Sequence, residues 1–173
     1  MEGFTPLIIS NLKWLEICGC GSVAAEVLSE AARTKTTVLA GSCQLEHLRV
    51  DSIAAVLVAP VCSRLSATLR KLCFSFDETI ERFTEEQEKA LQLLTTLEEL
   101  RFPGCSSLQS LPEVLHRLCS LKKLDILRCG KIQSLPKSGL PTSLESLVAI
   151  GCNNKLRIKL RELEESHPDL DIH

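Results

Sequence analysis

The side chains with the greatest chemical potential in this sequence are its cysteines and histidines. The chain of 173 residues contains nine cysteines and four histidines. Thiolates and imidazoles bind metals or act as nucleophile and base only when several of them lie close together. Cys18 and Cys20 have no second pair at metal-ligand spacing, and the histidines lie in unrelated segments, at positions 47, 116, 167 and 173. The sequence therefore predicts no metal site.

The short motifs that mark common active sites are also missing from the sequence. It has no Gly-rich phosphate loop followed by Lys, no H-E-x-x-H and no G-x-S-x-G. The basic cluster from Lys155 to Arg161 contains no aromatic residue and is followed directly by acidic residues. This pattern favours a solvated helix face over a nucleic-acid site. We expect a protein that is not an enzyme, with no catalytic residues and no cofactor.

Several cysteines instead occupy one position of an internal repeat. The segment 94–112 recurs 24 positions later, as the segment 118–136. The matched positions are Leu94 and Leu118, Leu97 and Leu121, Leu100 and Leu124, Phe102 and Ile126, Cys105 and Cys129, Leu108 and Ile132, Leu111 and Leu135, and Pro112 and Pro136. A fixed period in the twenties is typical of a solenoid, in which each repeat buries its apolar side against its neighbours.

The first half of each repeat has the pattern of a short β-strand. Leu100 and Phe102 are two positions apart and point to one side of the strand, whereas Glu99 and Arg101 point to the other. The following cysteine turns the chain out of the strand. A proline then fixes φ and keeps the return segment from pairing as another central strand. This is the pattern of a leucine-rich repeat.

We therefore predict an α/β fold, a leucine-rich-repeat solenoid that forms a segment of a horseshoe. A parallel sheet should line the concave side, with helices or irregular turns on the convex side. Residues 1–173 should form a single domain of about six repeats. The predicted strands lie near Leu15, Leu48, Leu72, Leu100, Leu124 and Leu147. The turn after each strand should place one residue of each repeat in a ladder, formed by Cys20, Ile53, Asp77, Cys105, Cys129 and Cys152.

The ladder cysteines have a structural role in this interpretation. A thiol is small and is a weak donor, so it can face carbonyl groups inside a turn without leaving a void. Stacked strands lie about 4.8 Å apart, which does not exclude disulfides between neighbouring rungs. In a cytosolic protein the thiols stay reduced, and this is the state that we expect.

Helices are predicted in the connections between strands. The segment 22–33 has a helix-compatible pattern, and the apolar segment 52–65 should be helical until Pro60. The run Thr84-Glu85-Glu86-Gln87 has the spacing of a capping box and predicts a helix that ends near Leu94.

Residues 153–173 should form a C-terminal cap. Asn153 or Asn154 can cap a helix, and Leu156, Leu160 and Leu163 follow at helical spacing. The alternation from 156 to 160 leaves a strand open as an alternative.

The outward side chains of the strands are the candidate binding surface. They comprise Trp14, His47, Arg49, Lys71, Glu99, Arg101, Lys123, Asp125, Leu127, Val148 and Ile150. Lys71, Glu99 and Lys123 alternate in sign, and exposed pairs of this kind contribute about 0–1 kcal/mol each. We therefore expect substitutions of Arg101, Lys123 or Asp125 to change stability by less than about 0.5 kcal/mol. Pro103 should join the last three residues in an apolar corner, a kind of patch that often marks a contact surface.

The overall composition limits the partners and the location. The formal net charge is −2, which argues against a general affinity for nucleic acid or for anionic membranes. No apolar run approaches the roughly 18 residues of a membrane helix, and no signal peptide opens the chain. We expect a cytoplasmic protein with a protein partner. Leu7, Ile8 and Ile9 look like the return segment of a repeat whose strand is absent, so we also expect that upstream repeats are missing from this chain.

The sequence resembles a known family in the segment 84–154 and at its tail. The motif C-x-x-L-x-x-L-P begins at Cys105 and recurs at Cys129 with Ile132 in place of its first Leu, and the run G-L-P-T-S-L-E-S-L-V-A-I-G-C-N-N ends at Asn154. These features are similar to the C-terminal leucine-rich-repeat region of plant nucleotide-binding leucine-rich-repeat disease-resistance proteins, which are intracellular immune receptors. The resemblance is weaker over residues 1–80, where the repeats are irregular. The ATPase domain of such receptors lies upstream of the repeats and is not part of this chain.

The resemblance implies a protein-recognition module. In that family the repeats sense a pathogen effector or hold the receptor's nucleotide-binding domain in an inactive state, so the partner would be one of these two proteins. Two alternatives remain open from the sequence: the substrate-recognition repeats of a ubiquitin-ligase adaptor, and a repeat protein that inhibits an enzyme.

Overall fold

A single parallel β-sheet forms the framework of the described residues. The computed structural model describes residues 12–19, 28 and 44–173. Within them, seven strands pair in chain order, and every neighbouring pair is parallel. The strands are β1 (Trp14–Ile17), β2 (His47–Val50), β3 (Lys71–Phe74), β4 (Glu99–Pro103), β5 (Lys123–Leu127), β6 (Ser146–Ile150) and β7 (Asp171–Ile172). The α/β class and the six predicted strands are confirmed, whereas β7 was not predicted.

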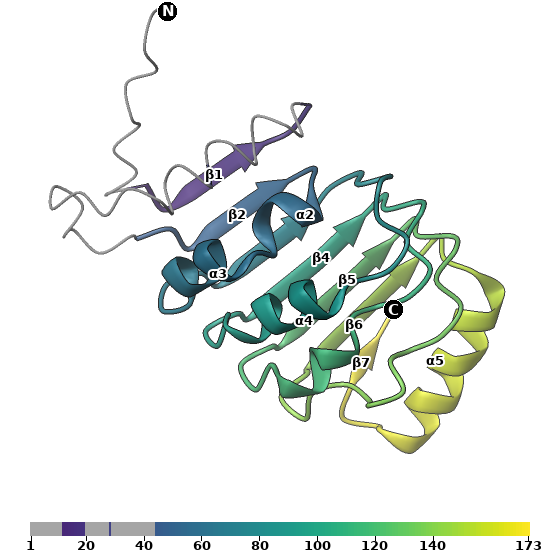
Figure 1. Cartoon of the computed structure of the whole chain (residues 1–173). Helices are drawn as coiled ribbons and strands as arrows, with labels where there is room; N and C mark the ends of the chain where they lie inside the picture. The colour runs from purple at the N-terminus through teal and green to yellow at the C-terminus, as the bar shows by residue number, and fades with distance from the viewer. Residues whose placement is uncertain (1–11, 20–27, 29–43) are drawn as a thin grey trace, which may run out of the picture.

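The segments that return between strands lie over one face of this sheet (Figure 1). They contain the helices α2 (Ile53–Val56), α3 (Ala59–Leu65) and α4 (Glu85–Gln92), and the 3-10 helix η3 (Glu113–Arg117). The last helix, α5 (Asn154–Ser166), lies beside β6 and β7 at the C-terminal end of the sheet. The opposite side of the sheet is called the open face below. The helix expected at 22–33 lies outside the described residues, apart from Leu28.

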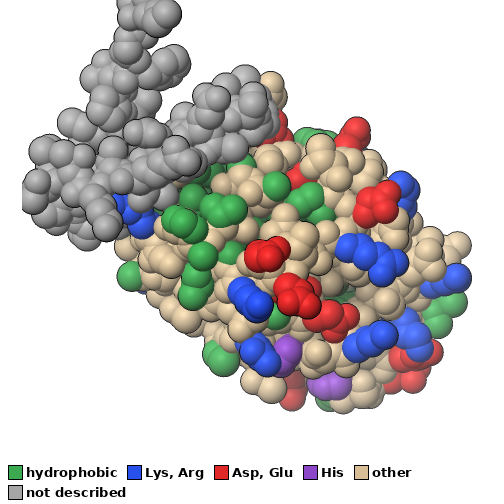
Figure 2. Space-filling model, in the orientation of Figure 1, with side chains coloured by type: hydrophobic (Ala, Val, Ile, Leu, Met, Phe, Trp, Pro, Cys, Tyr) green, Lys and Arg blue, Asp and Glu red, His purple; other side chains and the backbone are tan. Residues whose placement is uncertain are grey.

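Figure 2 shows the helix-covered side of the molecule. Apolar side chains gather over α2 and α3, where Ala54, Val58, Ala59 and Pro60 are exposed. Charged side chains of both signs gather over and beyond α4. The two ends of this surface therefore differ in character.

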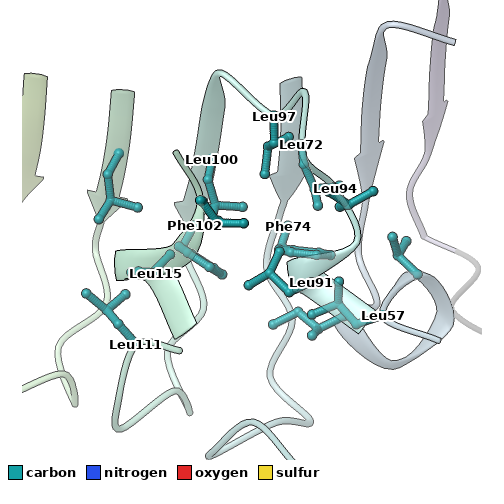
Figure 3. Packing of buried hydrophobic residues seen from close by; sticks show 14 of the residues in the cluster. Leu57, Leu72, Phe74, Leu91, Leu94, Leu97, Leu100, Phe102, Leu111 and Leu115 are labelled. Carbon is teal, nitrogen blue, oxygen red and sulfur yellow. The ribbon is translucent and has the colours of Figure 1, made fainter. Parts of the chain in front are cut away.

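The core lies between the sheet and the return segments (Figure 3). In each of the strands β2 to β5, alternate side chains point inward because of the pleat. Leu48, Leu72, Leu100 and Leu124 are at most 2% exposed and lie next to one another across the sheet. Two strand positions further on, the rings of Phe74 and Phe102 stack with centroids 5.7 Å apart. Each strand thus contributes two apolar side chains to a continuous core.

The strand register stays constant although the connecting segments differ in length. Leu15 pairs with Leu48, Leu48 with Leu72, Leu72 with Leu100, Leu100 with Leu124, and Leu124 with Leu147. The separation is 33 residues for the first pair and 24 for the pair of Leu100 and Leu124. The additional residues are therefore accommodated outside the sheet, and the outward side chains also form straight rows.

Buried thiols link consecutive repeats at the turns. Cys105 donates through Sγ to the carbonyl oxygen of Phe74 at 3.1 Å, and Cys129 donates in the same way to Phe102 at 3.1 Å. Cys152 donates to Ile126 at 3.2 Å. Each acceptor belongs to the preceding strand, so each thiol satisfies a carbonyl of the previous repeat. This arrangement confirms the predicted donor role of the ladder; Cys20 lies outside the described residues.

Asp77 fills the ladder position after β3 in a different way. Its side chain is buried and accepts a hydrogen bond from the backbone N–H of Ile53 at 2.7 Å. The other carboxylate oxygen accepts from the backbone N–H of Thr79 at 2.8 Å and from the Thr79 hydroxyl at 2.6 Å. Ile53 is the preceding ladder residue, so this carboxylate also joins two repeats.

A residue with positive φ precedes several ladder positions. Gly104 and Gly151 have φ of 75° and 69°, while Phe76 and Arg128 have φ of 58° and 57°. A bulky residue in this region is strained, whereas glycine adopts it freely. The Gly-Cys pairs at 104–105 and 151–152 are therefore part of the turn, which the sequence analysis did not recognise.

The ends of two helices follow the predicted capping signals. Thr84 accepts through Oγ1 from the backbone N–H of Gln87 at 3.2 Å, and the Gln87 side chain accepts from the Thr84 N–H at 2.9 Å. The predicted capping box is thus confirmed, and α4 ends two residues before Leu94. Asn153 caps α5 by accepting from the Lys155 N–H at 2.8 Å, which confirms the helical alternative for the C-terminal segment.

The predicted end of a helix at Pro60 was wrong. Residues 53–65 form two short helices, and Pro60 lies in the first turn of the second one. Proline lacks an N–H, and the first turn of a helix leaves its N–H groups without intrahelical acceptors. Pro60 therefore lies at the beginning of α3 and does not end a helix.

Candidate functional site

The strand register assembles the outward side chains into three rows across the open face. The first row contains Trp14, His47, Lys71, Glu99, Lys123, Ser146 and Asp171. The second row contains Glu16, Arg49, Cys73, Arg101, Asp125 and Val148. The third row contains Pro103, Leu127 and Ile150. All eleven residues of the predicted binding surface lie in these rows.

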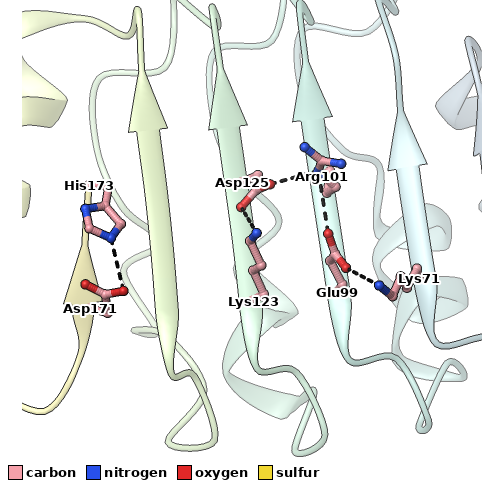
Figure 4. Close-up of polar contacts among 7 residues, drawn as sticks. All are labelled: Lys71, Glu99, Arg101, Lys123, Asp125, Asp171 and His173. Atoms are coloured by element: carbon pink, nitrogen blue, oxygen red, sulfur yellow. Dashed lines mark hydrogen bonds and ion pairs between the residues drawn. The ribbon is translucent and has the colours of Figure 1, made fainter.

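A continuous network of charges crosses β3, β4 and β5 (Figure 4). Lys71 Nζ lies 3.1 Å from Glu99 Oε2, and Arg101 Nε lies 3.7 Å from Glu99 Oε1. The same Nε donates to Asp125 Oδ2 at 2.8 Å. Lys123 Nζ lies 3.8 Å from Asp125 Oδ1. The network therefore alternates in sign, with three cations around two carboxylates.

Asp125 differs from the prediction because its side chain is only 3% exposed. It points outward from the sheet, but neighbouring side chains cover it. Its Oδ1 atom is buried without a hydrogen-bond partner, since the contact to Lys123 is an ion pair at 3.8 Å and too long for a hydrogen bond. Removing a partner from a buried charge is costly. The premise that the Asp125 side chain is exposed was therefore wrong, and we now expect changes of Arg101 or Asp125 to cost more stability than the sequence suggested.

The apolar corner consists of Pro103, Leu127, Val148 and Ile150. Pro103 pairs with Leu127 and Leu127 with Ile150, so three of its members are direct neighbours at the C-terminal ends of β4, β5 and β6. Ile150 is the most exposed of them, at 59%. The corner lies directly beyond Arg101 and Asp125 along the strands.

Phe76 extends this apolar surface toward β3 and was missed by the sequence analysis. Its side chain is 61% exposed, and its backbone N–H donates to the carbonyl of Pro103 at 2.8 Å. A Cβ atom on Gly104 would lie 2.4 Å from the Phe76 ring, so the ring packs against a position that only glycine leaves free. The sequence signal for this contact is an aromatic residue directly before one ladder position, Phe76, and a Gly-Cys pair at the same place in the next repeat, Gly104-Cys105.

The N-terminal part of the rows is more polar. Trp14 is 64% exposed on β1. Arg49 donates through Nε to Ser75 Oγ at 2.7 Å and lies 3.4 Å from Glu16 Oε1. His47 is partly buried between Trp14 and Lys71 in the first row. The three predicted residues Trp14, His47 and Arg49 therefore lie together, and the structure records no hydrogen bond or ion pair between them and the charge network.

The last strand adds two polar residues that were not predicted as part of the surface. Asp171 continues the first row on β7. His173 follows it, donates its backbone N–H to the carbonyl of Leu147 at 3.0 Å, and lies through Nε2 3.0 Å from Asp171 Oδ2. Strand β7 therefore forms the C-terminal edge of the sheet. Its two-residue length is too short to produce a strand signal in the sequence.

Burial and hydrogen bonding shift the pKa values of the thiols in and near the ladder. The hydrogen bond with the Cys129 thiol and burial both raise the pKa of Cys105. Burial raises the pKa of Cys152, and it raises the pKa of Cys62 to about 12. Because the thiolate is the nucleophile, these shifts favour the protonated thiol at Cys62, Cys105 and Cys152. The hydrogen bond with Cys105 instead lowers the pKa of Cys129. Cys105 and Cys129 are fully buried, so their thiols contribute to packing and do not line the open face.

Small-molecule and metal sites are not apparent in the described part of the chain. No group of three His, Cys, Asp or Glu side chains there could hold a metal ion. One cavity of about 300 Å³ is lined by residues such as Lys13, Glu46 and Arg70, and another of about 150 Å³ lies between α5 and the C-terminal tail. Both lie away from the charge network.

Comparisons with known proteins add no identification. A scan of the chain against protein-family models finds no match, and a search of the curated proteins finds no matching protein. Among the described residues, no helix is long and apolar enough to cross a membrane.

Proposed function

We propose that this chain is a leucine-rich-repeat solenoid that acts as the protein-recognition module of an intracellular plant immune receptor. The repeat spacing, the in-register strands and the thiol ladder support the solenoid. The motifs C-x-x-L-x-x-L-P and the run that ends at Asn154 support the resemblance to the receptor family. The partner is a pathogen effector or the nucleotide-binding domain of the same receptor.

One observation carries the recognition role. The inward positions of β2 to β6 are almost uniformly apolar, whereas the outward positions at the same register include cations, carboxylates and exposed apolar side chains. Packing alone requires only the inward set. The outward set forms a continuous surface over several strands, which is the geometry that a protein partner can contact over a large area.

The cytoplasm suits this function and the thiols. Cys105, Cys129 and Cys152 act as hydrogen-bond donors only while they are reduced. Reducing compartments maintain free thiols. A location in the cytoplasm therefore preserves the contacts between repeats.

The test uses the gene in the organism that carries it. Lys71→Glu combined with Lys123→Glu changes the open face but leaves the ion pair between Arg101 and Asp125 in place. We expect a receptor with these changes either to lose its defence response to the pathogen or to respond without one. Protein abundance is measured in parallel, so that a loss of folding is distinguished from a loss of recognition.

A matched control has the same change in charge outside the three rows. Lys131→Glu combined with Lys137→Glu alters two exposed lysines in the turns that follow β5. This variant should behave as the unaltered receptor does. If the open-face variant accumulates normally and also responds normally in both conditions, recognition does not use the open face and the proposal is wrong.

A further inference from the structure

In the charge network of the open face, the cationic side chains are more exposed than the carboxylates. The side chains of Lys71, Arg101 and Lys123 are 49%, 42% and 44% exposed, respectively. Those of Glu99 and Asp125 are 15% and 3% exposed. Although the network contains both signs, a partner that approaches from the open side meets mainly ammonium and guanidinium groups. The surface potential there is therefore positive.

Arg101 keeps donors available for such a partner. Its hydrogen bond to Asp125 and its contact with Glu99 both use Nε. Its terminal amino groups make no hydrogen bond to the described residues. A guanidinium group presents a planar set of donors that matches the two oxygens of a carboxylate. The buried carboxylates fix the position of Arg101 while its outer edge stays free to donate.

The apolar corner lies at a defined distance from these cations. Arg101 and Pro103 are separated by two positions on β4, as are Asp125 and Leu127 on β5. Two strand positions correspond to about 7 Å. A partner that fits both features carries a carboxylate and, about 7 Å away on the same side, an apolar side chain. Phe76 and Ile150 are the most exposed apolar groups at this end of the face and provide the larger contacts.

We infer that the open face binds an acidic protein segment in which a carboxylate precedes an apolar side chain along the direction of the strands. This inference rests on the proposed recognition function and adds the chemistry of the partner. Nucleic acid fits less well, because the apolar corner lies directly beside these cations along the strands. No aromatic side chain alternates with the cations of β3, β4 and β5 to stack on bases.

The experiment selects peptides with the full chain as bait. A display library of random linear peptides is panned against the unaltered chain, against Lys71→Glu with Lys123→Glu, and against Lys131→Glu with Lys137→Glu. We expect the unaltered chain and the control variant, Lys131→Glu with Lys137→Glu, to enrich peptides that combine Asp or Glu with a following apolar residue. These peptides should bind the open-face variant at least about tenfold more weakly.

A further variant separates the contribution of the apolar corner from that of the charge network. Leu127→Ser combined with Ile150→Ser should still enrich acidic peptides but should no longer select apolar residues. Because Lys71→Glu places a new carboxylate beside Glu99, Lys71→Gln with Lys123→Gln serves as a version without added repulsion. Thermal unfolding of each bait verifies that it is folded, and amide chemical shifts of the chain locate the bound peptide.

The outcomes distinguish the inference from the proposed function. Peptides that shift the amides of β3 to β6 but show no enrichment in acidic residues would overturn the inferred chemistry and leave the recognition role intact. Peptides that bind away from the open face would overturn both. Equal affinity of the acidic peptides for the unaltered chain and the folded open-face variant would also overturn the inference, as would displacement of the peptides by an equal concentration of a single-stranded DNA oligonucleotide.

Discussion

The turn after β3 and the turns after β4, β5 and β6 bond to the preceding repeat through different side chains. In the later turns a thiol donates to a carbonyl of the preceding strand at 3.1–3.2 Å. After β3, the carboxylate of Asp77 instead accepts from the N–H of Ile53 at 2.7 Å. The polarity of the ladder bond after β3 is therefore the reverse of that after β4, β5 and β6.

This difference shows what the ladder position requires. In these four turns the ladder residue is a small polar group that reaches the preceding repeat, but it need not be a cysteine. After β2 the position holds the apolar Ile53. A carboxylate is tolerated after β3 because Thr79 adds two further donors, at 2.6 and 2.8 Å. A buried acceptor is stable when its hydrogen bonds are satisfied and costly when they are not. The local sequence two residues beyond the ladder therefore decides which side chain can be used.

The largest expected effect comes from removing the carboxylate. Asp77→Leu keeps the branching of the side chain but leaves the Ile53 N–H buried without an acceptor, and it also removes both bonds from Thr79. We expect a loss of about 4 kcal/mol in the free energy of unfolding. Asp77→Asn keeps one acceptor oxygen and should lose about half as much. Urea denaturation measures both, and a Leu variant as stable as the unaltered chain would contradict the assigned role of Asp77.

The reverse exchange tests the thiol repeats. Cys129→Asp places a carboxylate near the carbonyl of Phe102, in a repeat that has Lys131 where Thr79 stands relative to Asp77. We expect a loss of about 3 kcal/mol, against about 1 kcal/mol for Cys129→Asn, which can still donate to that carbonyl.

Adding Lys131→Thr to the Cys129→Asp variant sharpens this comparison. The new hydroxyl supplies the donor that Asp77 has, so part of the lost stability should return. Melting temperatures of the three variants provide the measurement. Equal values for Cys129→Asp and Cys129→Asn would mean that the polarity of the bond is unimportant.

A smaller effect is expected on the open face. Arg101→Ala removes the hydrogen-bond donor of the buried Asp125 and should cost about 1–2 kcal/mol. Lys71→Ala removes a partner of Glu99, which retains Arg101, and should cost less than about 0.5 kcal/mol. Chemical denaturation of the two variants tests whether burial of the carboxylate sets the cost. A more destabilised Lys71 variant would contradict this assignment.

The smallest effect at neutral pH concerns the thiols. The pKa of Cys62 is raised from 9.0 to about 12 by burial. Its contribution to stability is therefore complete below pH 9 and is lost as the pH rises from 9 to 12, because only the unfolded chain then releases the proton. We expect a flat stability profile from pH 6 to 8 and a decrease above pH 9 of about 1.4 kcal/mol per pH unit for this thiol. Cys62→Ala should reduce that slope when unfolding is followed at each pH.

The sequence predicted the strands and the rows well because both depend on local periodicity. Leu100 and Phe102, two positions apart and repeated as Leu124 and Ile126, determine which side of each strand is buried. Once the inward Leu is known, the parallel register determines the neighbours of Glu99 or Arg101 without further information. The capping box at Thr84 was equally local, since it depends on residues three positions apart.

The features that the sequence analysis missed depend on contacts between distant segments. The burial of Asp125 results from side chains of two strands, 24 residues apart in the case of Arg101. Strand β7 has two residues and is recognisable only once the tail returns to β6. The pattern also cannot distinguish a proline that ends a helix from one that begins the next, as Pro60 does. Position along the chain carries little information about such contacts.

The ladder also has a mechanical consequence. Because each thiol ties its repeat to the one before, the repeats are connected in series, and a force that pulls on the two ends of the chain loads these ties one after another. The release of a 24-residue repeat such as that from Leu100 to Leu124 would lengthen the chain by about 80 Å. At the Asp77 junction a charged carboxylate accepts the hydrogen bond from the Ile53 N–H of the preceding repeat, and two bonds from Thr79 hold that carboxylate in place. At the later junctions the donor is a thiol, which forms a weaker hydrogen bond. We therefore expect the repeats joined at Asp77 to separate at a higher force than the repeats joined by thiols.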